Sequence, residues 1–329
     1  MITRAFFSAL TVLALAAIPL APAMAQAQGK FPERTLRLVV PFAPGGVNDI
    51  IGRRWAQEMT RVLGQNMIVE NRAGASGAIG AMEVMRAKPD GYTLLATNST
   101  THVLNPLGNK NLGYDPLKDF TALGIITLVP TGVAVHPSLP VKNLKELIAF
   151  AKKNPGQLSF GSAGTGSITH LTGELFKKLN GDLKIVHVPY KGAGPGLADL
   201  VAGHIPMYTP TISPAPLEYH RAGRIRMLAI CSDERLKVAP DVPTAPEAGM
   251  PGLIVQAFNA IFLPPGMPRP VVDALHQANQ KAMVNAGMQD FLRKAGAEPV
   301  TTSSPEHATQ FIQKELQRWG PIVREVGVE

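Results

Sequence analysis

The sequence contains very little cysteine and few long apolar runs, and both shortages limit what the protein can be. Cys231 is its only cysteine, so no internal disulfide can form and stability must come from packing. This residue follows the apolar run 227–230, which favours a small buried thiol over a reactive one. After the first 25 residues, no apolar stretch approaches the roughly 20 residues that a membrane-spanning helix needs.

The usual motifs of catalytic and metal sites are also missing. No Gly-x-Ser-x-Gly pattern occurs, so a Ser-His-Asp triad lacks its common local signature. The eight histidines are dispersed, without His-x-x-x-His spacing or a Cys/His cluster, and this gives no support to a metal site. The pair Gly164-x-Gly166 lacks the third glycine of a dinucleotide motif, since Thr169 stands in its place. We therefore expect no metal, no cofactor and no catalytic residues.

Length and charge narrow the class of protein further. A chain of 329 residues is long enough for two domains, and 45% hydrophobic with 17% charged residues is a globular composition. The formal net charge of +8 favours anionic partners. The basic residues are scattered, however, without a basic run or interleaved aromatics, so we expect no nucleic-acid binding.

The first 25 residues have the pattern of a secretory signal peptide. Arg4 supplies a positive charge, residues 9–20 form an apolar stretch, and residues 23–25 read Ala-Met-Ala, a small-x-small cleavage site. We expect cleavage after Ala25 and a periplasmic mature protein.

Strands and helices alternate regularly in two blocks, which predicts an α/β fold with two lobes. The first block predicts strands at Leu36–Val40, Met67–Glu70 and Thr93–Ala96, with helices at Ile50–Leu63 and Ile79–Ala87. The second block predicts helices at Leu144–Lys153, Ile168–Leu179 and Leu197–Ala202, with strands ending at Phe160 and covering Lys184–Val188 and Ile225–Ile230. We expect a mixed, mostly parallel sheet in each lobe, with helices on its faces.

The last third of the chain is predicted to return to the first lobe. The segment 239–270 is rich in proline and glycine and is predicted to be irregular chain that crosses between the lobes. Two helices, Val271–Ala286 and Pro305–Trp319, are expected to pack on the first lobe, the second with Ser304 as its N-cap. The predicted division is residues 26–127 plus 245–329 for lobe 1 and residues 128–244 for lobe 2.

Three loops that follow predicted strands are small, polar and rich in hydrogen-bond donors. Glycines let backbone N–H groups approach a ligand, and a helix N-terminus favours negative charge, so these loops predict an anion site at the carboxyl ends of the strands. The candidate residues are Phe42, Ala43, Gly45, Gly46, Val47, Asn48 and Asp49; Asn98, Ser99 and Thr100; and Ser162, Ala163, Gly164, Thr165, Gly166 and Ser167. Lys191 and Asn259 complete the set. The alternative, that the loops are merely tight turns with Asp49 and Ser167 as N-caps, stays open.

Six motifs in order resemble the Bug family of extracytoplasmic receptors for tripartite tricarboxylate transporters. They lie at 32–46, 69–75, 89–94, 114–120, 187–192 and 241–249, and they cover essentially the whole mature chain. The resemblance implies a two-lobed periplasmic binding protein fold of type II that closes on its ligand between the lobes. It also implies a carboxylate ligand held by backbone N–H and hydroxyl groups, a permease with one large and one small subunit, and no enzyme activity; we expect a monomer.

Departures from the family pattern bear on the ligand. Val47-Asn48-Asp49 replaces the family's usual Ser-Thr-Asp, and Phe258 stands where a tryptophan is common. The loss of two hydroxyls suits a less polar or aromatic acid, while di- and tricarboxylates and acidic amino acids remain candidates. Two alternatives stay open: an exported α/β hydrolase, which needs a hydroxyl within hydrogen-bond reach of a histidine, and a ligand sensor for a signalling partner.

Overall fold

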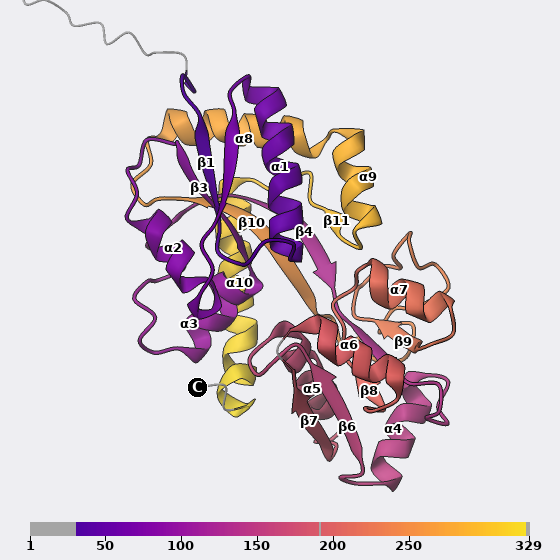
Figure 1. Ribbon diagram of the computed structural model, residues 1–329. Coiled ribbons are helices and arrows are strands. Elements are labelled where there is room, and N and C mark those ends of the chain that lie inside the picture. Colours follow the sequence, from indigo (N-terminus) through magenta and orange to yellow (C-terminus); the bar gives the residue numbers. More distant parts are fainter. Residues whose placement is uncertain (1–30, 191, 327–329) are drawn as a thin grey trace, which may run out of the picture.

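The computed structural model describes residues 31–190 and 192–326, which form two α/β lobes (Figure 1). Lobe 1 is built on a six-stranded sheet and lobe 2 on a five-stranded sheet. The predicted signal peptide, 1–25, and its cleavage site lie outside the described residues. Within the described ranges, no helix has both the length and the apolar character that crossing a bilayer requires.

The lobe 1 sheet has the strand order β11-β4-β10-β3-β1-β2. Its strands are β1 Leu36–Val40, β2 Met67–Asn71, β3 Thr93–Asn98, β4 Thr121–Pro130, β10 Gln256–Leu263 and β11 Glu298–Pro299. β1 is apolar along most of its length because both of its faces are buried: Leu38 packs into one core cluster and Val39 into the other.

Helices cover both faces of this sheet. They are α1 Val47–Leu63, α2 Ala78–Met85, α3 Asn105–Gly108, α8 Arg269–Met283, α9 Ala286–Lys294 and α10 Pro305–Val326, with short turns η1 Ala75–Gly77 and η2 Thr100–Leu104. Helices α1, α8 and α9 share one core cluster with Leu38, through Trp55, Leu275 and Leu292. Helices α2 and α10 pack on the opposite face, and α10 extends from lobe 1 towards lobe 2 (Figure 1).

The lobe 2 sheet has the strand order β7-β6-β8-β5-β9. Its strands are β5 Gly132–Val135, β6 Leu158–Ser162, β7 Ile185–Pro189, β8 Met207–Tyr208 and β9 Arg226–Ile230, and its helices are α4 Leu144–Lys153, α5 Ile168–Leu179, α6 Ala193–Ala202 and α7 Pro214–Arg221. Leu147 of α4 and Phe176 of α5 belong to the core cluster that continues into lobe 1. Leu200 of α6 and Leu217 of α7 belong to a separate cluster on the other face.

The mixed character of both sheets is confirmed, but the prediction of mostly parallel pairing is wrong. In lobe 1, β1 pairs in parallel with β2 and β3, whereas β10 and β11 pair antiparallel with their neighbours. In lobe 2, β6 pairs in parallel with β7 and β8, and β5 pairs antiparallel with β8 and β9. β5 and β10, the strands that come directly after the two crossings between the lobes, both pair antiparallel with their neighbours.

The prediction that 239–270 is irregular is wrong for its central part. Gln256–Leu263 forms β10, which lies between β3 and β4 and is buried along most of its length. Such a strand reads as a short apolar run without alternation, and the prolines and glycines on both sides concealed it.

The predicted helix Val271–Ala286 ends at Met283, and a second helix, α9, follows it. The expected return of the C-terminal helices to lobe 1 is confirmed, as is Ser304 before α10, whose Oγ accepts from His307 N–H at 3.1 Å.

Two segments cross between the lobes and are hydrogen-bonded to each other. The first crosses at Thr131 between β4 and β5, and the second runs from Cys231 to Val255. Thr131 N–H donates to Val255 O at 2.9 Å, and Cys231 N–H donates to Thr131 O at 2.8 Å. Cys231 is completely buried, which confirms the predicted buried thiol, and burial raises the pKa of this thiol to about 12.

Candidate functional site

The loop after β1 is fixed by the Asp49 carboxylate in the first turn of α1. Asp49 is 3% exposed; its Oδ2 accepts from Gly45 N–H at 2.9 Å and from Arg53 Nε at 3.0 Å, and its Oδ1 accepts from Asn71 Nδ2 at 2.8 Å. Burial by itself would raise the pKa of this carboxyl, but the hydrogen bonds from Arg53, Gly45 and Asn71 hold it below its usual value. Asp49 therefore shapes the loop and already has partners for both oxygens.

The neighbouring Asn48 begins a chain of buried polar side chains that enters the lobe 1 sheet. Its Nδ2 donates to Thr97 O at 3.2 Å and to Asn259 Oδ1 at 3.0 Å, and Asn259 Nδ2 donates to Thr127 Oγ1 at 2.9 Å. Asn48 is only 6% exposed, and its Oδ1 has no hydrogen-bond partner within the described part of the chain.

The loop after β3 presents donors to the same region. Asn98 Oδ1 accepts from Thr101 N–H at 3.2 Å, and Ser99 Oγ accepts from Phe258 N–H at 2.8 Å. Each of these bonds uses one of the two lone pairs of the oxygen that accepts it. The Asn98 Nδ2 group and the Ser99 hydroxyl proton have no acceptor among residues 31–190 and 192–326, so both can donate to a ligand.

The loop between β6 and α5 forms the facing wall on lobe 2. Ser167 caps α5 by accepting from His170 N–H at 3.2 Å, as the alternative interpretation of this loop as a capped turn expects. That interpretation is wrong for Asp49, because the N-cap of α1 is Gly46. Thr169 Oγ1 accepts from Ala163 N–H at 2.8 Å and lies 2.8 Å from Ser167 Oγ. Hydroxyl groups therefore hold this loop in place.

Behind this loop, Ser162 Oγ lies 2.7 Å from His187 Nε2, the contact that the hydrolase alternative needs. Ser162 is completely buried, and its Oγ also bonds to Gly164 N and O at 3.1 and 3.2 Å. Burial, with a smaller contribution from His170, lowers the pKa of His187 to about 4. Because no surface of Ser162 is open to a substrate, this pair fixes the loop in the present conformation.

Two adjoining cavities lie where the loops of the two lobes meet. The first has a volume of about 210 Å³ and is lined by Val47, Asn48, Asn98, Ser99, Thr100, Val129, Ile168, Ala193, Thr211, Ser213, Ala257, Phe258 and Asn259. The second has a volume of about 310 Å³ and is lined by Ser76, Thr100, Leu104, Asn105, Gly108, Asn109, Ala163, Gly164, Thr165, Gly166 and Ser167. They share Thr100, and together they form the cleft between the lobes.

The structure places eleven of the predicted residues on the lining of these cavities: Val47, Asn48, Asn98, Ser99, Thr100, Ala163, Gly164, Thr165, Gly166, Ser167 and Asn259. Those that line neither cavity are Phe42, Ala43, Gly45, Gly46, Asp49 and Ser162. Lys191 lies outside the described residues. Sequence reasoning missed Thr211 and Ser213, which follow β8, because a strand of two residues leaves no periodic pattern.

No acidic or basic side chain lines either cavity within the described part of the chain. Among the described residues, the groups that an anion in the cleft would meet are neutral: hydroxyls, side-chain amides and backbone N–H groups. The described residues also contain no group of three His, Cys, Asp or Glu side chains placed to hold a metal ion.

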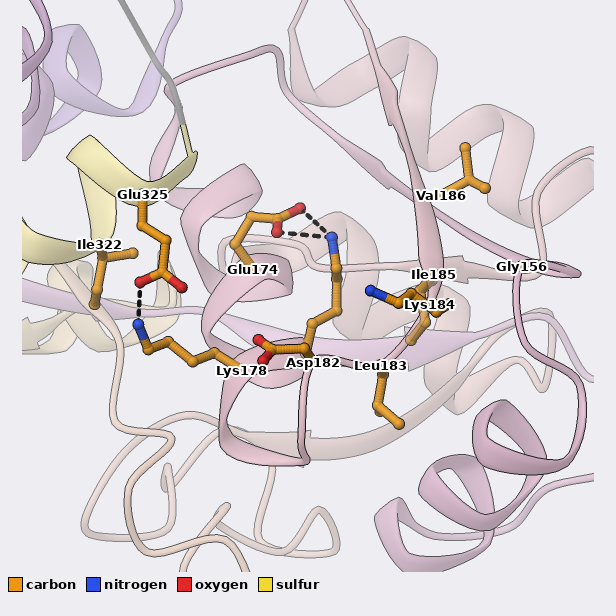
Figure 2. Close-up of a pocket in the computed structure, with 11 residues that line it drawn as sticks. Gly156, Glu174, Lys178, Asp182, Leu183, Lys184, Ile185, Val186, Ile322 and Glu325 are labelled. Carbon is orange, nitrogen blue, oxygen red and sulfur yellow. Dashed lines mark hydrogen bonds and ion pairs between the residues drawn. The ribbon is translucent and has the colours of Figure 1, made fainter.

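A larger cavity of about 500 Å³ lies elsewhere, between α5, β7 and the end of α10 (Figure 2). Its charged side chains are largely paired with one another: Lys177 Nζ lies 2.7 Å from Glu174 Oε2, and Lys178 pairs with Glu325. The cleft is the better ligand site because uncharged groups of both lobes line it, and because the Asn98 amide and the Ser99 hydroxyl have protons without an acceptor among the described residues.

Two α/β lobes joined by two adjacent crossings, with a donor-lined cleft between them, define a solute receptor of the periplasmic binding protein class. Residues 51–328 match the profile of the tripartite tricarboxylate transporter family receptor, TctC, and the chain belongs to this family of solute-binding receptors. The family that the sequence motifs predicted is confirmed.

Relatives with this fold extend over nearly the whole chain. A UPF0065 protein of Bordetella pertussis is 36% identical over 323 residues, which is 98% of each chain. The structure of MatC from Rhodopseudomonas palustris with bound malate is 34% identical, with a TM-score of 0.76 over 89% of this chain and 100% of that one. The R. palustris protein Rpa4515 with adipate is also 34% identical, with a TM-score of 0.78 over 90% of this chain and 98% of that one.

Proposed function

We propose that this protein captures a small carboxylate in the cleft between its lobes and delivers it to a membrane permease with one large and one small subunit. The observation that carries the proposal is the cleft itself, which is lined by neutral hydrogen-bond donors from both lobes and by no acidic side chain among the described residues. The malate and adipate bound to MatC and Rpa4515 are both small dicarboxylates, which supports the same class of ligand.

The direct ligand contacts in this proposal are the predicted residues that line the two cavities. Asn98 and Ser99 donate from lobe 1, while the Ala163–Ser167 loop contributes from lobe 2. Asp49 and Ser162 act behind the cleft surface by fixing the two loops. Ligand contact on both lobes favours the closed arrangement and shifts the population towards it.

The proposal includes export and a monomeric mature protein. The sequence of residues 1–25 supports a signal peptide cleaved after Ala25 and delivery to the periplasm. We assign residues 26–127 with 245–329 to lobe 1 and residues 128–244 to lobe 2. Both divisions then fall close to or within the segments that cross between the lobes.

The ligand leaves chemically unchanged in this proposal. The Ser162 to His187 contact favours the hydrolase alternative, and the complete burial of Ser162 opposes it. A sensor for a signalling partner would use the same cleft, so the partner must be tested separately by co-purification with the permease subunits.

The decisive test is calorimetric titration of the mature chain with di- and tricarboxylates, aromatic acids and acidic amino acids, followed by recovery of the ligand. We expect saturable binding of at least one acid, which is recovered intact. Ser99→Ala should weaken that binding about tenfold or more, since a hydrogen bond to a carboxylate is lost. Ser232→Ala is the matched control, because Ser232 is a buried serine that bonds to Glu234 O and lines neither cleft cavity. Failure of every acid to bind, or its steady consumption, would overturn the proposal.

A further inference from the structure

The lobe 2 loop of the cleft is bonded to a nitrogen atom that can accept a hydrogen bond only while it carries no proton. Gly166 lines the cavity of about 310 Å³, and its N–H donates to His170 Nδ1 at 3.2 Å. A backbone N–H group can only donate, so Nδ1 of His170 is unprotonated in this conformation. The neutral imidazole then carries its one proton on Nε2.

The orientation of the His170 ring is fixed from two sides. On the side away from Gly166, Nε2 lies 3.6 Å from Glu174 Oε1. Turning the ring over would place carbon atoms beside Gly166 N–H and beside Glu174, so both contacts would be lost. His170 is 4% exposed, and its backbone N–H donates to Ser167 Oγ. The side chain and the backbone of this buried residue therefore both bond to the loop.

A second proton on His170 would have to enter at Nδ1, the atom that Gly166 N–H occupies. Two N–H groups would then face each other in place of a donor and an acceptor. The added proton and the hydrogen bond from Gly166 therefore exclude each other. A charged His170 cannot hold the loop in the conformation that lines the cleft.

The groups that face His170 come from α5 itself and from two strands. His187 of β7 stacks on its ring with 3.8 Å between the ring centroids, and the uncharged Phe160 of β6 stacks on His187. Glu174 attracts a charged His170, but Lys177 Nζ lies 2.7 Å from Glu174 Oε2 and offsets part of that charge. Burial lowers the pKa of His187 to about 4, so the neighbouring ring stays neutral when His170 takes up a proton near the usual pH for histidine.

The N-terminus of α5 also disfavours a positive charge on His170. This residue lies in the first turn of α5, where the helix dipole is positive. Helix α10 packs against α5 as well, and the acidic residue that it places there, Glu325, pairs with Lys178 (Figure 2). The surroundings thus favour the neutral ring while the loop is in place, and Glu174 offers the charged ring a partner once the loop has moved.

We propose that His170 is a positioning residue that makes ligand capture depend on pH, because its neutral ring holds the Gly166 loop in the binding conformation and its protonated ring releases it. This inference rests on the proposed capture of a carboxylate. A proton from solvent adds to Nδ1, and the hydrogen bond from Gly166 N–H is lost. Ligand binds the molecules with a neutral His170, so the apparent affinity is full above the usual titration range of histidine and falls as the pH falls through it.

Calorimetric titration at about pH 7.5, 6.5 and 5.5, with an acid that binds at the highest pH, tests this inference. The variant is His170→Asn, whose side-chain oxygen takes the place of Nδ1 and accepts from Gly166 N–H at every pH. From the highest to the lowest pH, we expect the affinity of the unmodified protein to fall about tenfold more than that of the variant, the effect of one hydrogen bond. Protonation of the ligand itself affects both proteins alike and cancels in this comparison.

His220→Asn is the matched control. His220 of lobe 2 accepts from Met227 N–H through Nδ1 at 3.3 Å, and its Nε2 lies 3.4 Å from Asp241 Oδ2, so it makes the same two kinds of contact as His170. It lines neither cleft cavity. This variant should keep the pH dependence of the unmodified protein.

Nitrogen NMR of the histidine rings follows the same proton without any substitution. In the free protein, we expect His170 Nδ1 to take up a proton as the pH falls. With ligand bound, Nδ1 should stay unprotonated to a lower pH. Equal protonation of Nδ1 in the free and the bound protein would overturn the inference, and this measurement decides even where His170→Asn does not fold.

The outcomes separate this inference from the function beneath it. Equal pH dependence in the unmodified protein and in His170→Asn overturns the inference and leaves carboxylate capture standing. A pH dependence that is removed by His187→Gln instead overturns it as well, because the proton then enters at the neighbouring ring. Absence of binding by every acid at neutral pH overturns both the inference and the proposed function.

Discussion

The two walls of the cleft present similar donors but are held in place by different chemistry. On lobe 1, the buried Asp49 carboxylate ties the loop to Arg53 and Asn71 through charge-assisted bonds. On lobe 2, hydroxyl groups of Thr169 and Ser167 hold the loop, with His187 behind it. A cleft wall made of uncharged donors can therefore be held in place either by an ion pair or by uncharged groups. These two kinds of contact should differ in how much they stabilise the fold and in how they respond to acid.

The largest expected effect comes from removing the charged support. Asp49→Ala should lower the free energy of unfolding by about 3 kcal/mol, because Gly45 N–H and Arg53 lose a buried acceptor. Urea denaturation measures this change. The control is Asp273→Ala, which breaks an Arg269 pair of the same i,i+4 spacing at an exposed site and should cost about 0.5 kcal/mol. Equal losses of unfolding free energy in the two variants would contradict the role of Asp49 in holding the lobe 1 loop.

As the pH falls, the contacts that hold the lobe 2 loop in front of His187 should weaken before the Asp49 contacts of lobe 1 do. Folded His187 has a pKa of about 4 against an ordinary value of 6.5, so the unfolded chain takes up a proton before the folded one does. Stability is therefore lost as the pH falls from about 6.5 to 4, by about 2 kcal/mol after allowance for partial exposure. The support by Asp49, whose pKa is lowered, persists until the pH falls below the usual carboxyl range.

A histidine variant isolates this effect of pH. His187→Gln should flatten the dependence of unfolding free energy on pH between about 7 and 4 by the same amount. His102 on lobe 1, whose pKa burial lowers to about 3, contributes equally to both proteins and cancels in the difference. His170, Glu174 and Lys177, which face His187, are unchanged in both. Identical pH profiles would show that His187 does not carry the acid response.

A smaller effect should follow from removing one neutral bond. Thr169→Val keeps the shape of the side chain but leaves Ala163 N–H without its acceptor, and should cost about 1 kcal/mol. Thr169→Ser keeps the hydroxyl and should cost less. Thermal denaturation of the three proteins checks the order, and a valine variant as stable as the parent would show that the loop does not depend on this bond.

The smallest effect is expected where the lobes touch away from the cleft. Lys178 of α5 pairs with Glu325 of α10, and their side chains are 47% and 53% exposed. Lys178→Gln should change stability by no more than about 0.5 kcal/mol, because exposed ion pairs contribute little. A double-mutant cycle with Glu325→Gln measures the coupling, and a value above about 1 kcal/mol would mean that this contact contributes to holding the lobes together.

The sequence predicted the elements with strong local signals. β1, α1, β2, α2 and β3 follow one another with regular apolar spacing and clear turn residues, and the structure confirms each of them. β10 has no such signal, because it is buried on both faces and its partners β3 and β4 are distant in the chain. Whether such a segment forms a strand depends on pairing with strands that are distant in the chain, and not on local propensity.

The sequence predicts which loops form the candidate site but not what each residue does there. Glycine and hydroxyl residues after strands located both walls of the cleft. The sequence does not reveal how many partners Asp49 has, nor that Asn48 has a buried oxygen without one among the described residues. These properties depend on residues as distant as Asn259, which only the folded chain brings into contact.

The hydrogen bonds among Thr131, Cys231 and Val255 bear on how the two lobes are arranged along the chain. All the strands of lobe 2 lie between β4 and β10, so this lobe is a single continuous insertion in lobe 1, and its two ends meet at hydrogen-bond distance. Units whose ends meet are the ones that tolerate transplantation and circular permutation. Lobe 2 could therefore be exchanged for that of a relative as one cassette, which would transfer one wall of the cleft while the other stays in place.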